Sequence, residues 1–165
     1  MPALTPPEPL CDKHDLSAFS CGEEILDQWL RQRASQNESS GASRTYVVCE
    51  GKTVCAFYSL SAGSIEHKFV PGNIRRNMPE PIPVMVLGRL AVDTRYMGRN
   101  IGTSLVQDAL LRTLRVAGEI GVRALLVHAL HEHAAGFYLR LGFMQSPFDP
   151  LVLFLGVKGL LKQLK

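Results

Sequence analysis

The chain lacks any apolar run long enough to cross a membrane. Its longest, PLVLFLGV, is far shorter than the about 20 residues that a spanning helix needs. Its first residues, MPALTPPEPL, lack the basic region and the apolar core of a secretory signal. We therefore expect a cytoplasmic protein with no membrane partner.

Cysteine and histidine also lack the spacings that predict a metal site. Reduced thiols are expected for the four cysteines, which are Cys11, Cys21, Cys49 and Cys55. His128, His131 and His133 cluster in the sequence, but neither an HExxH spacing nor a nearby cysteine accompanies them. We interpret them as the polar entrance to a helix, and no metal is predicted.

The net charge of +3 is too small to identify a partner by itself. Most of the 18 basic residues are arginines, the side chain best suited to forked contacts with phosphate. Two interpretations stay open: a solvated surface, or a polyanionic partner such as nucleic acid or a phosphorylated cofactor.

What the sequence does contain is an alternation of helix and strand patterns within the length of one domain, residues 1–165. The expected elements are a helix at 20–36, a hairpin at 44–63, a proline-rich loop at 71–83, a strand at 84–92, a helix ending at 117, a strand at 122–130, a helix at 131–143, and strands at 143–145 and 151–156. This order predicts an α/β (α+β) fold, a mixed sheet flanked by helices.

The first helix carries a start signal and an apolar face. Ser20 followed by Glu23 is typical of a capping box. The residues expected to share one helical face are Ile25, Leu26, Trp29 and Leu30.

The most informative stretch is GRLAVDTRYMGRNIGTSLVQDAL, residues 88–110. It predicts an apolar strand, a tight turn with Gly98 and Gly102, and an amphipathic helix. Such a turn holds anions, because unpaired N–H groups and the positive end of the helix dipole meet there. The Lys-Ser or Lys-Thr of a nucleoside triphosphatase is missing, and so is the three-glycine spacing of a dinucleotide-binding turn.

Together with LGRLAVD before it and FYLRLGF after it, this turn resembles that of the GNAT N-acetyltransferase superfamily. The resemblance implies a GNAT fold with a mixed, mostly antiparallel sheet, and acetyl-CoA as co-substrate with its pyrophosphate on the turn. Met97 and Asn100 depart from the usual pattern, but Asn tolerates left-handed backbone. The cofactor-binding residues implied are Leu90, Ala91, Val92, Met97, Gly98, Arg99, Asn100, Ile101, Gly102, Thr103, Ser104, His131 and Phe137.

A narrower resemblance covers nearly the whole chain. CGEEILDQWL, GASRTYVV, NMPEPIPVMVLGRLAVD and LLVHAL…FYLRLGF are similar to the GNAT toxins of bacterial toxin–antitoxin pairs, of the TacT kind. This implies acetylation of the α-amino group of aminoacyl-tRNA, which blocks translation. It also implies a ribbon-helix-helix antitoxin that neutralises the toxin and represses the operon through operator DNA. A second copy of the chain is a further candidate partner.

The resemblance assigns catalysis to Tyr138, which patterning alone would place on an apolar helix face. A neutral amine would attack the acetyl thioester, and Tyr138 would donate a proton to the departing sulfur. A phenol has a pKa of about 10 and a thiol about 8.5, so the role is part acid and part hydrogen-bond donor.

Two further features bear on the acceptor. No Asp or Glu stands in VMVLGRLAV to act as a base, which favours an α-amine, with a pKa of about 8, over a lysine at about 10.4. Candidate contacts to tRNA are Arg75 and Arg76 in the proline-rich loop, Arg44 near the first helix, and Arg89. An unpaired charge at Arg89, within an apolar strand, would be costly, so Arg89 is expected to face either the substrate or a phosphate of the cofactor.

Two other functions stay open. The chain could be a GNAT enzyme that acetylates a small amine or a protein N-terminus. It could also be a non-catalytic module whose turn binds a nucleotide or nucleic acid.

Overall fold

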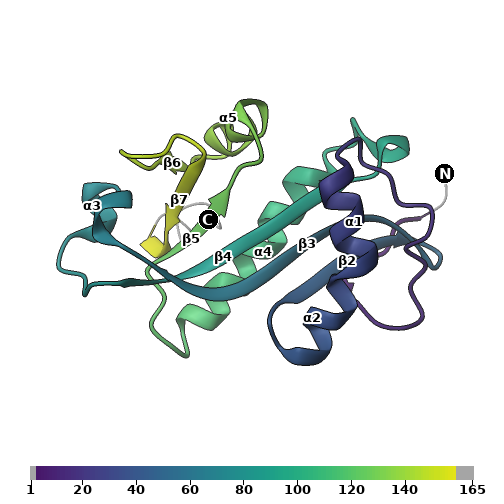
Figure 1. The fold of residues 1–165 in the computed structure, drawn as a ribbon, viewed down its shortest axis with the longest axis horizontal. Coiled ribbons are helices and arrows are strands. Elements are labelled where there is room, and N and C mark those ends of the chain that lie inside the picture. The colour runs from purple at the N-terminus through teal and green to yellow at the C-terminus, as the bar shows by residue number, and fades with distance from the viewer. Residues whose placement is uncertain (1–2, 159–165) are drawn as a thin grey trace. The chain divides into compact units, whose positions relative to one another are not determined.

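The computed structural model describes residues 3–158, which form two compact units. The first unit holds residues up to 61 together with 88–109, and the second holds 62–87 and those from 110 onward. Seven strands join in the order β1-β2-β3-β4-β5-β7-β6 (Figure 1). The predicted mixed sheet flanked by helices is confirmed, whereas the single-domain organisation stays a prediction.

The sheet of the first unit begins at the edge strand β1 (Glu8–Pro9), which pairs antiparallel with β2 (Arg44–Glu50). The predicted hairpin is confirmed, because β2 pairs antiparallel with β3 (Thr53–Ile65) through a turn in which Gly51 has a φ of +64°. Strand β1 was not predicted, since two residues that include a proline carry no strand periodicity.

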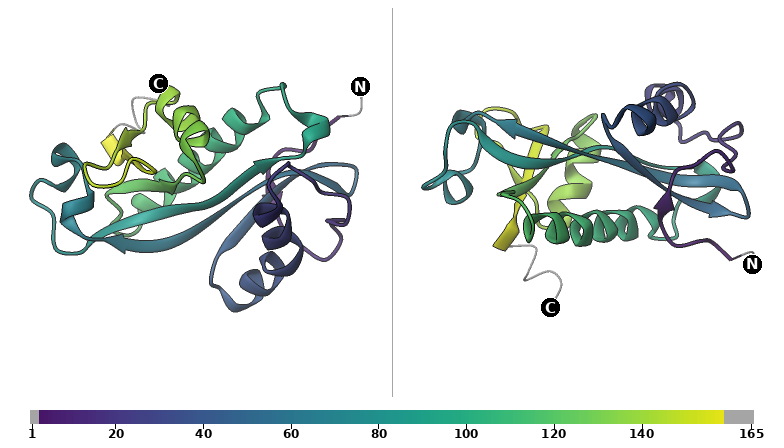
Figure 2. Two further views of the ribbon diagram at one scale, coloured as in Figure 1. Left: turned by 45° about the horizontal axis from the view of Figure 1, so that its top comes forward. Right: turned by 90° about the horizontal axis from the view of Figure 1, so that it is seen from below.

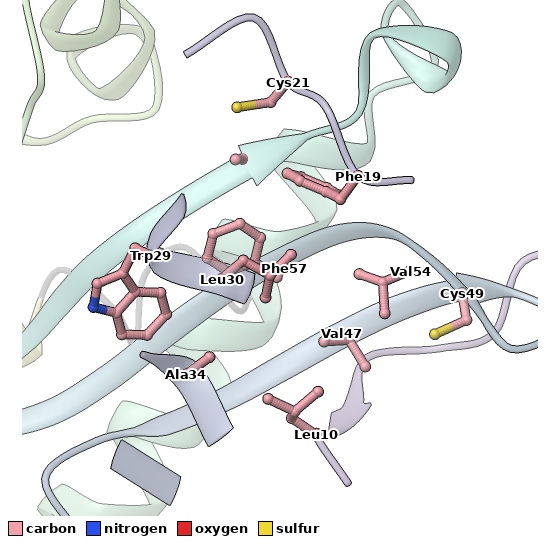
Figure 3. Close-up of a cluster of buried hydrophobic side chains, with 11 residues drawn as sticks. Leu10, Phe19, Cys21, Trp29, Leu30, Ala34, Val47, Cys49, Val54 and Phe57 are labelled. Carbon is pink, nitrogen blue, oxygen red and sulfur yellow. The ribbon is translucent and has the colours of Figure 1, made fainter. Parts of the chain in front are cut away.

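Helices α1 (Glu24–Gln32) and α2 (Ala34–Ser40) cover one face of β2 and β3, opposite the first turns of α4 (Ile101–Ala117) (Figure 2). Trp29 and Leu30 of α1 enter a core with Val47 and Phe57 from the two strands (Figure 3). Burial of these apolar side chains fixes the helices on the sheet.

Successive residues of β3 serve opposite faces, as a strand requires. The ring of Phe57 stacks on Trp29 at 6.0 Å between centroids. Its neighbour Tyr58 points the other way, and its hydroxyl donates to the carboxylate of Asp108 on α4. The alternation gives this part of the sheet helices on both sides.

The predicted capping box is wrong. The N-cap of α1 is Glu23, and the backbone N–H of Ser20 donates instead to the Asp93 carboxylate at 3.1 Å. Ile25 is also misplaced by the prediction, because it is 63% exposed. The helical region ends at Gly41, whose φ of +81° suits glycine.

The second unit is built on β5 (Ala124–His128), which pairs in parallel with the first half of β4 (Ile82–Val92). On its other side β5 pairs antiparallel with β7 (Val152–Gly156), and β7 pairs antiparallel with β6 (Met144–Gln145). These strands were all predicted, with β4 as a central one.

The segment 71–83 is not wholly the loop that its prolines predicted. The short helix α3 (Gly72–Arg75) follows a 3-10 turn, η1 (His67–Phe69), and β4 already begins at Ile82. The side chain of Ile74 is buried among Val84 and Phe154, which holds the helical turn against the sheet.

The remaining helices agree with the prediction. Helix α4 ends at Ala117, and Gly118 follows it. Helix α5 (Glu132–Arg140) is followed by Gly142 with a φ of +99°. None of the helices within residues 3–158 has the length and apolar character that crossing a membrane demands.

Candidate functional site

The turn between β4 and α4 belongs to the first unit and is exposed to solvent. It runs from the 3-10 turn η2 (Thr94–Tyr96) to the first residue of α4. Gly98 has a φ of +81° and Asn100 a φ of +59°, so the left-handed conformation expected of Asn100 is confirmed.

The start of α4 has the groups that an anion needs. The carbonyl of Asn100 accepts from the backbone N–H and the hydroxyl of Ser104, at 3.1 and 3.2 Å, which closes the first helical turn. The preceding N–H groups, of Ile101, Gly102 and Thr103, have no acceptor in a helix by its geometry, and they carry the positive end of the dipole. The turn therefore fits a pyrophosphate.

Asp93, at the end of β4, fixes the start of this turn. Its buried carboxylate accepts from Ser20 N–H, from Arg95 N–H, and from Nε and Nη2 of the Arg95 guanidinium, at 2.9–3.1 Å. Burial by itself would raise the pKa of Asp93, but these hydrogen bonds outweigh it and the pKa is lowered. Asp93 was not among the predicted site residues, although an Asp directly after an apolar strand is a cap signal.

Tyr96 anchors the next step of the turn. Its hydroxyl donates to the carboxylate of Glu50 on β2, and its ring is 8% exposed. The guanidinium carbons of Arg95 and Arg99 lie 5.6 and 5.3 Å from the ring centroid. Arg99 thereby places a cation at the turn that is suited to an anion, whereas the charge of Arg95 is paired with Asp93.

Tyr138 belongs to the second unit, on α5. Its side chain is 5% exposed and packs edge-on against Phe137 and Phe143, with centroids 5.0 and 5.4 Å apart. Burial raises the pKa of its hydroxyl above the ordinary value. Within residues 3–158 this hydroxyl has no hydrogen-bond partner, so its proton is available to a ligand.

The histidines stand where a polar helix entrance was expected. His131 is the N-cap of α5, and its Nδ1 accepts from the N–H of Ala134 at 3.2 Å. Nε2 of His128 lies 3.9 Å from the carboxylate of Asp149. Capping occupies one ring nitrogen of His131, so any contact to a cofactor would use the rest of the ring.

Potential metal ligands gather at another place within residues 3–158, where Glu8, His14 and Cys49 have ligand atoms within 4.8 Å of one another. Nδ1 of His14 accepts from the N–H of Cys11, and Nε2 lies 2.7 Å from Glu8. The imidazole proton then sits on Nε2 and is donated to Glu8. Glu8 and His14 thus satisfy each other within the N-terminal segment, and the backbone N–H of Cys49 on β2 donates to the Thr5 hydroxyl at 2.9 Å.

One family model covers the turn and the helices around it. The model of the acetyltransferase (GNAT) domain matches residues 41–145, which run from the hairpin through α5. The chain belongs to the GNAT acetyltransferases.

Relatives of this GNAT chain match it over nearly its full length. A tRNA-acetylating toxin of Mycobacterium tuberculosis is 46% identical over 158 residues, 96% of this chain and 95% of that protein. AtaT complexed with acetyl-methionyl-tRNAfMet has a TM-score of 0.90 and 29% identity, and covers 99% of this chain and 100% of its own. A tyrosine-to-phenylalanine mutant of AtaT, bound to the C-terminus of the antitoxin AtaR and acetyl-CoA, has a TM-score of 0.81 and 30% identity over 96% of each chain.

The end of β4 divides its side chains between two faces. Ala91 is buried in the core beneath α1, whereas Leu90 and Val92 are half-buried on the alternate face. Of these three predicted cofactor contacts, Ala91 therefore has only its backbone to offer.

The predicted tRNA contacts differ in their surroundings. Arg75 and Arg76 are exposed, and the guanidinium of Arg123 holds their helical turn by donating to the carbonyl of Ile74 at 2.7 Å. Arg44 already pairs with Glu38 at 2.7 Å. Arg89, on β4, lies with its guanidinium carbon 4.7 Å from the Trp29 ring.

Proposed function

We propose that this GNAT chain is a toxin that transfers the acetyl group of acetyl-CoA to the α-amino group of aminoacyl-tRNA and thereby blocks translation. The observation that carries the proposal is the 46% identity, over almost the full length of both chains, to a tRNA-acetylating toxin. A neighbour solved with acetyl-methionyl-tRNAfMet, of 0.90 TM-score, supports the same substrate class.

The turn at 97–104 is assigned to the pyrophosphate of acetyl-CoA. Acetyl-CoA supplies an activated acetyl thioester. The first N–H groups of α4 would bind the two phosphates, and Arg99, held against Tyr96, would add a positive charge beside them. Gly102→Val tests this assignment, since a branched side chain in the first turn would keep phosphate away from the backbone and weaken acetyl-CoA binding.

Tyr138 is assigned to the departing thiolate. Its hydroxyl has no partner among the described residues, and its raised pKa keeps it protonated. It therefore donates a hydrogen bond, and in part a proton, as negative charge develops on the sulfur.

The acceptor is assigned as an α-amino group, because β4 carries no carboxylate that could deprotonate a lysine. An α-amine, with a pKa of about 8, is partly neutral at physiological pH. Arg75, Arg76, Arg44 and Arg89 are assigned to tRNA. Arg44 would first have to leave Glu38, which makes it the weakest of the four.

A ribbon-helix-helix antitoxin is the proposed partner, and operator DNA is reached through it. The complex of AtaT with the C-terminus of AtaR supports the antitoxin. We place the protein in the cytoplasm, where charged tRNA is found, and treat residues 1–165 as one functional domain.

The test is incubation with labelled acetyl-CoA and charged tRNA, followed by hydrolysis and identification of the acetylated amino acid. Label on the α-amine is expected. Label on a small amine or a protein N-terminus instead would identify a GNAT of another specificity. Failure to bind acetyl-CoA would identify a binding module.

A further inference from the structure

Arg89 carries a positive charge at an exposed position of β4. Its guanidinium lies against the indole of Trp29 at 4.7 Å, while the residue as a whole is exposed. Within residues 3–158, no carboxylate pairs with it and no acceptor takes a hydrogen bond from its guanidinium. By contrast, Arg95 is paired with Asp93 and Arg44 with Glu38.

Both the backbone and the side chain of Arg89 are nevertheless held in place. Its backbone N–H donates to the buried Ser59 hydroxyl at 3.1 Å, and a Cβ at the preceding Gly88 would come within 2.9 Å of the same oxygen. Trp29 in turn stacks on Phe57, with ring planes 10° apart (Figure 3). The guanidinium thus rests on an aromatic pair anchored in the core.

This arrangement has a desolvation cost that an external anion would help to offset. Contact with the indole removes water from one side of the guanidinium, and this desolvation lowers the pKa of Arg89. The cation–π contact compensates part of the loss. The exposed side keeps several N–H donors in a fixed fork, which matches the oxygens of a phosphate or a carboxylate.

The substrate class decides between these two anions. In an aminoacyl-tRNA the carboxyl group of the amino acid is esterified and carries no charge, so the negative charges are the phosphodiesters. Arg89 precedes Leu90, Ala91 and Val92, the strand residues assigned to the cofactor, and lies in the same unit. If those strand residues bind the acetyl end of the cofactor, an anion bound by Arg89 would lie near the end of the RNA that carries the amino acid.

We propose that Arg89 binds the phosphodiester next to the terminal adenosine of the tRNA, and so distinguishes an amino acid on RNA from the same amino acid on a nucleoside. The inference rests on the proposed function. It makes Arg89 a specificity-determining residue whose effect depends on the presence of one phosphate.

The experiment compares three acceptors esterified with the same amino acid: tRNA, the dinucleotide cytidylyl-adenosine, and adenosine. For Arg89→Ala we expect kcat/KM to fall about tenfold or more on tRNA and on the dinucleotide, as for the loss of a charge-assisted hydrogen bond. On aminoacyl-adenosine it should match the wild type. Arg89→Lys keeps the charge but loses the forked geometry, so its kcat/KM on tRNA and on the dinucleotide should lie between those of the wild type and Arg89→Ala.

Arg115→Ala is the matched control, because it removes one exposed arginine from α4. Unchanged acetyl-CoA affinity of Arg89→Ala, measured by calorimetry, shows that the fold is kept. An equal loss on all three acceptors, or no loss on the dinucleotide, overturns the inference. Intact acetylation together with weaker antitoxin binding also overturns it, since the anion would then be a carboxylate of the partner. If the wild type acetylates none of the three, the proposed function itself fails.

Discussion

Tyr138 keeps its proton throughout the physiological pH range, because burial raises its pKa above the ordinary value of about 10. A phenol that is harder to ionise is a weaker acid, so the role proposed for Tyr138 is mainly that of a fixed hydrogen-bond donor to the sulfur. The aromatic contacts with Phe137 and Phe143 hold the ring without using the hydroxyl.

Tyr138→Phe should therefore separate catalysis from folding. The ring contacts remain and no protein acceptor within residues 3–158 loses a partner, so we expect a change in unfolding free energy below about 0.5 kcal/mol. Acetyl-CoA affinity by calorimetry should be unchanged, while turnover falls at least about tenfold. Turnover equal to that of the wild type would remove Tyr138 from the mechanism.

Asp93→Asn should loosen the cofactor turn. An amide has one oxygen and cannot accept both hydrogen bonds from the Arg95 guanidinium. We therefore expect the unfolding free energy at pH 7 to fall by about 1–3 kcal/mol and acetyl-CoA binding to weaken. The folded pKa of Asp93 is lowered, so its stabilisation is present above the unfolded pKa of about 3.9 and is lost as pH falls through the folded value.

The stability difference between the wild type and Asp93→Asn should consequently shrink in acid, as measured by urea unfolding from pH 7 downward. Asp12→Asn, at an exposed position, is the control and should show little difference at any pH. A difference that stays constant below a pH of about 3.9 would contradict the role of the carboxylate charge.

Tyr138 and Asp93 differ in how well the sequence alone predicts the role of a single residue. Tyr138 was predicted only through the resemblance of the chain to a family, because its spacing is also that of an ordinary apolar helix face. Asp93 was not predicted although its three bonds to Arg95 are local; only its bond to Ser20, 73 positions away, leaves no local pattern in the sequence.

Among the elements, the turn before α4 depends on two left-handed residues of different kinds. A Cβ added at Gly98 would meet open space, but the φ of +81° there means that any side chain brings backbone strain. Asn100 adopts a φ of +59° despite its side chain.

Gly98→Ala and Asn100→Gly should consequently differ in their effects. The first should cost about 1–2 kcal/mol and weaken acetyl-CoA binding, because the turn must hold a conformation that alanine avoids. The second should change stability by less than about 1 kcal/mol and leave affinity close to the wild type. Thermal unfolding and calorimetry check both, and equal effects of the two changes would contradict this account.

Most elements were predicted because their apolar residues repeat with the period of a helix or a strand. The hairpin, β4, α4 and the C-terminal strands all belong to this group. Helix α1 starts later than predicted because Gly22 has a φ of +92°, which a right-handed helix cannot include. Helix α3 was not predicted because prolines flank it. Its one turn is stabilised by buried Ile74 and by Arg123, contacts that periodicity does not contain.

For the molecule as a whole, the proposed substrate requires positive charge beyond the reacting groups. Association with tRNA is dominated by phosphates, and each contact releases counterions. In the second unit Arg75 and Arg76 are exposed side by side, on a turn that Arg123 ties to the sheet. A basic pair held on a fixed turn is suited to a regular phosphate backbone.

Changing Arg75 and Arg76 together to Ala should weaken binding of charged tRNA and reduce the salt dependence, the slope of log K against log salt, by roughly one or two units. Acetyl-CoA affinity should stay unchanged, since the turn at 97–104 is not altered. The control replaces Arg115 and Lys158, both exposed in the same unit, and so removes the same charge. If the pair meets acidic groups of the antitoxin instead, tRNA binding will keep its slope while antitoxin affinity falls. A slope reduced equally by the control would mean that net charge, and not this pair, attracts the RNA.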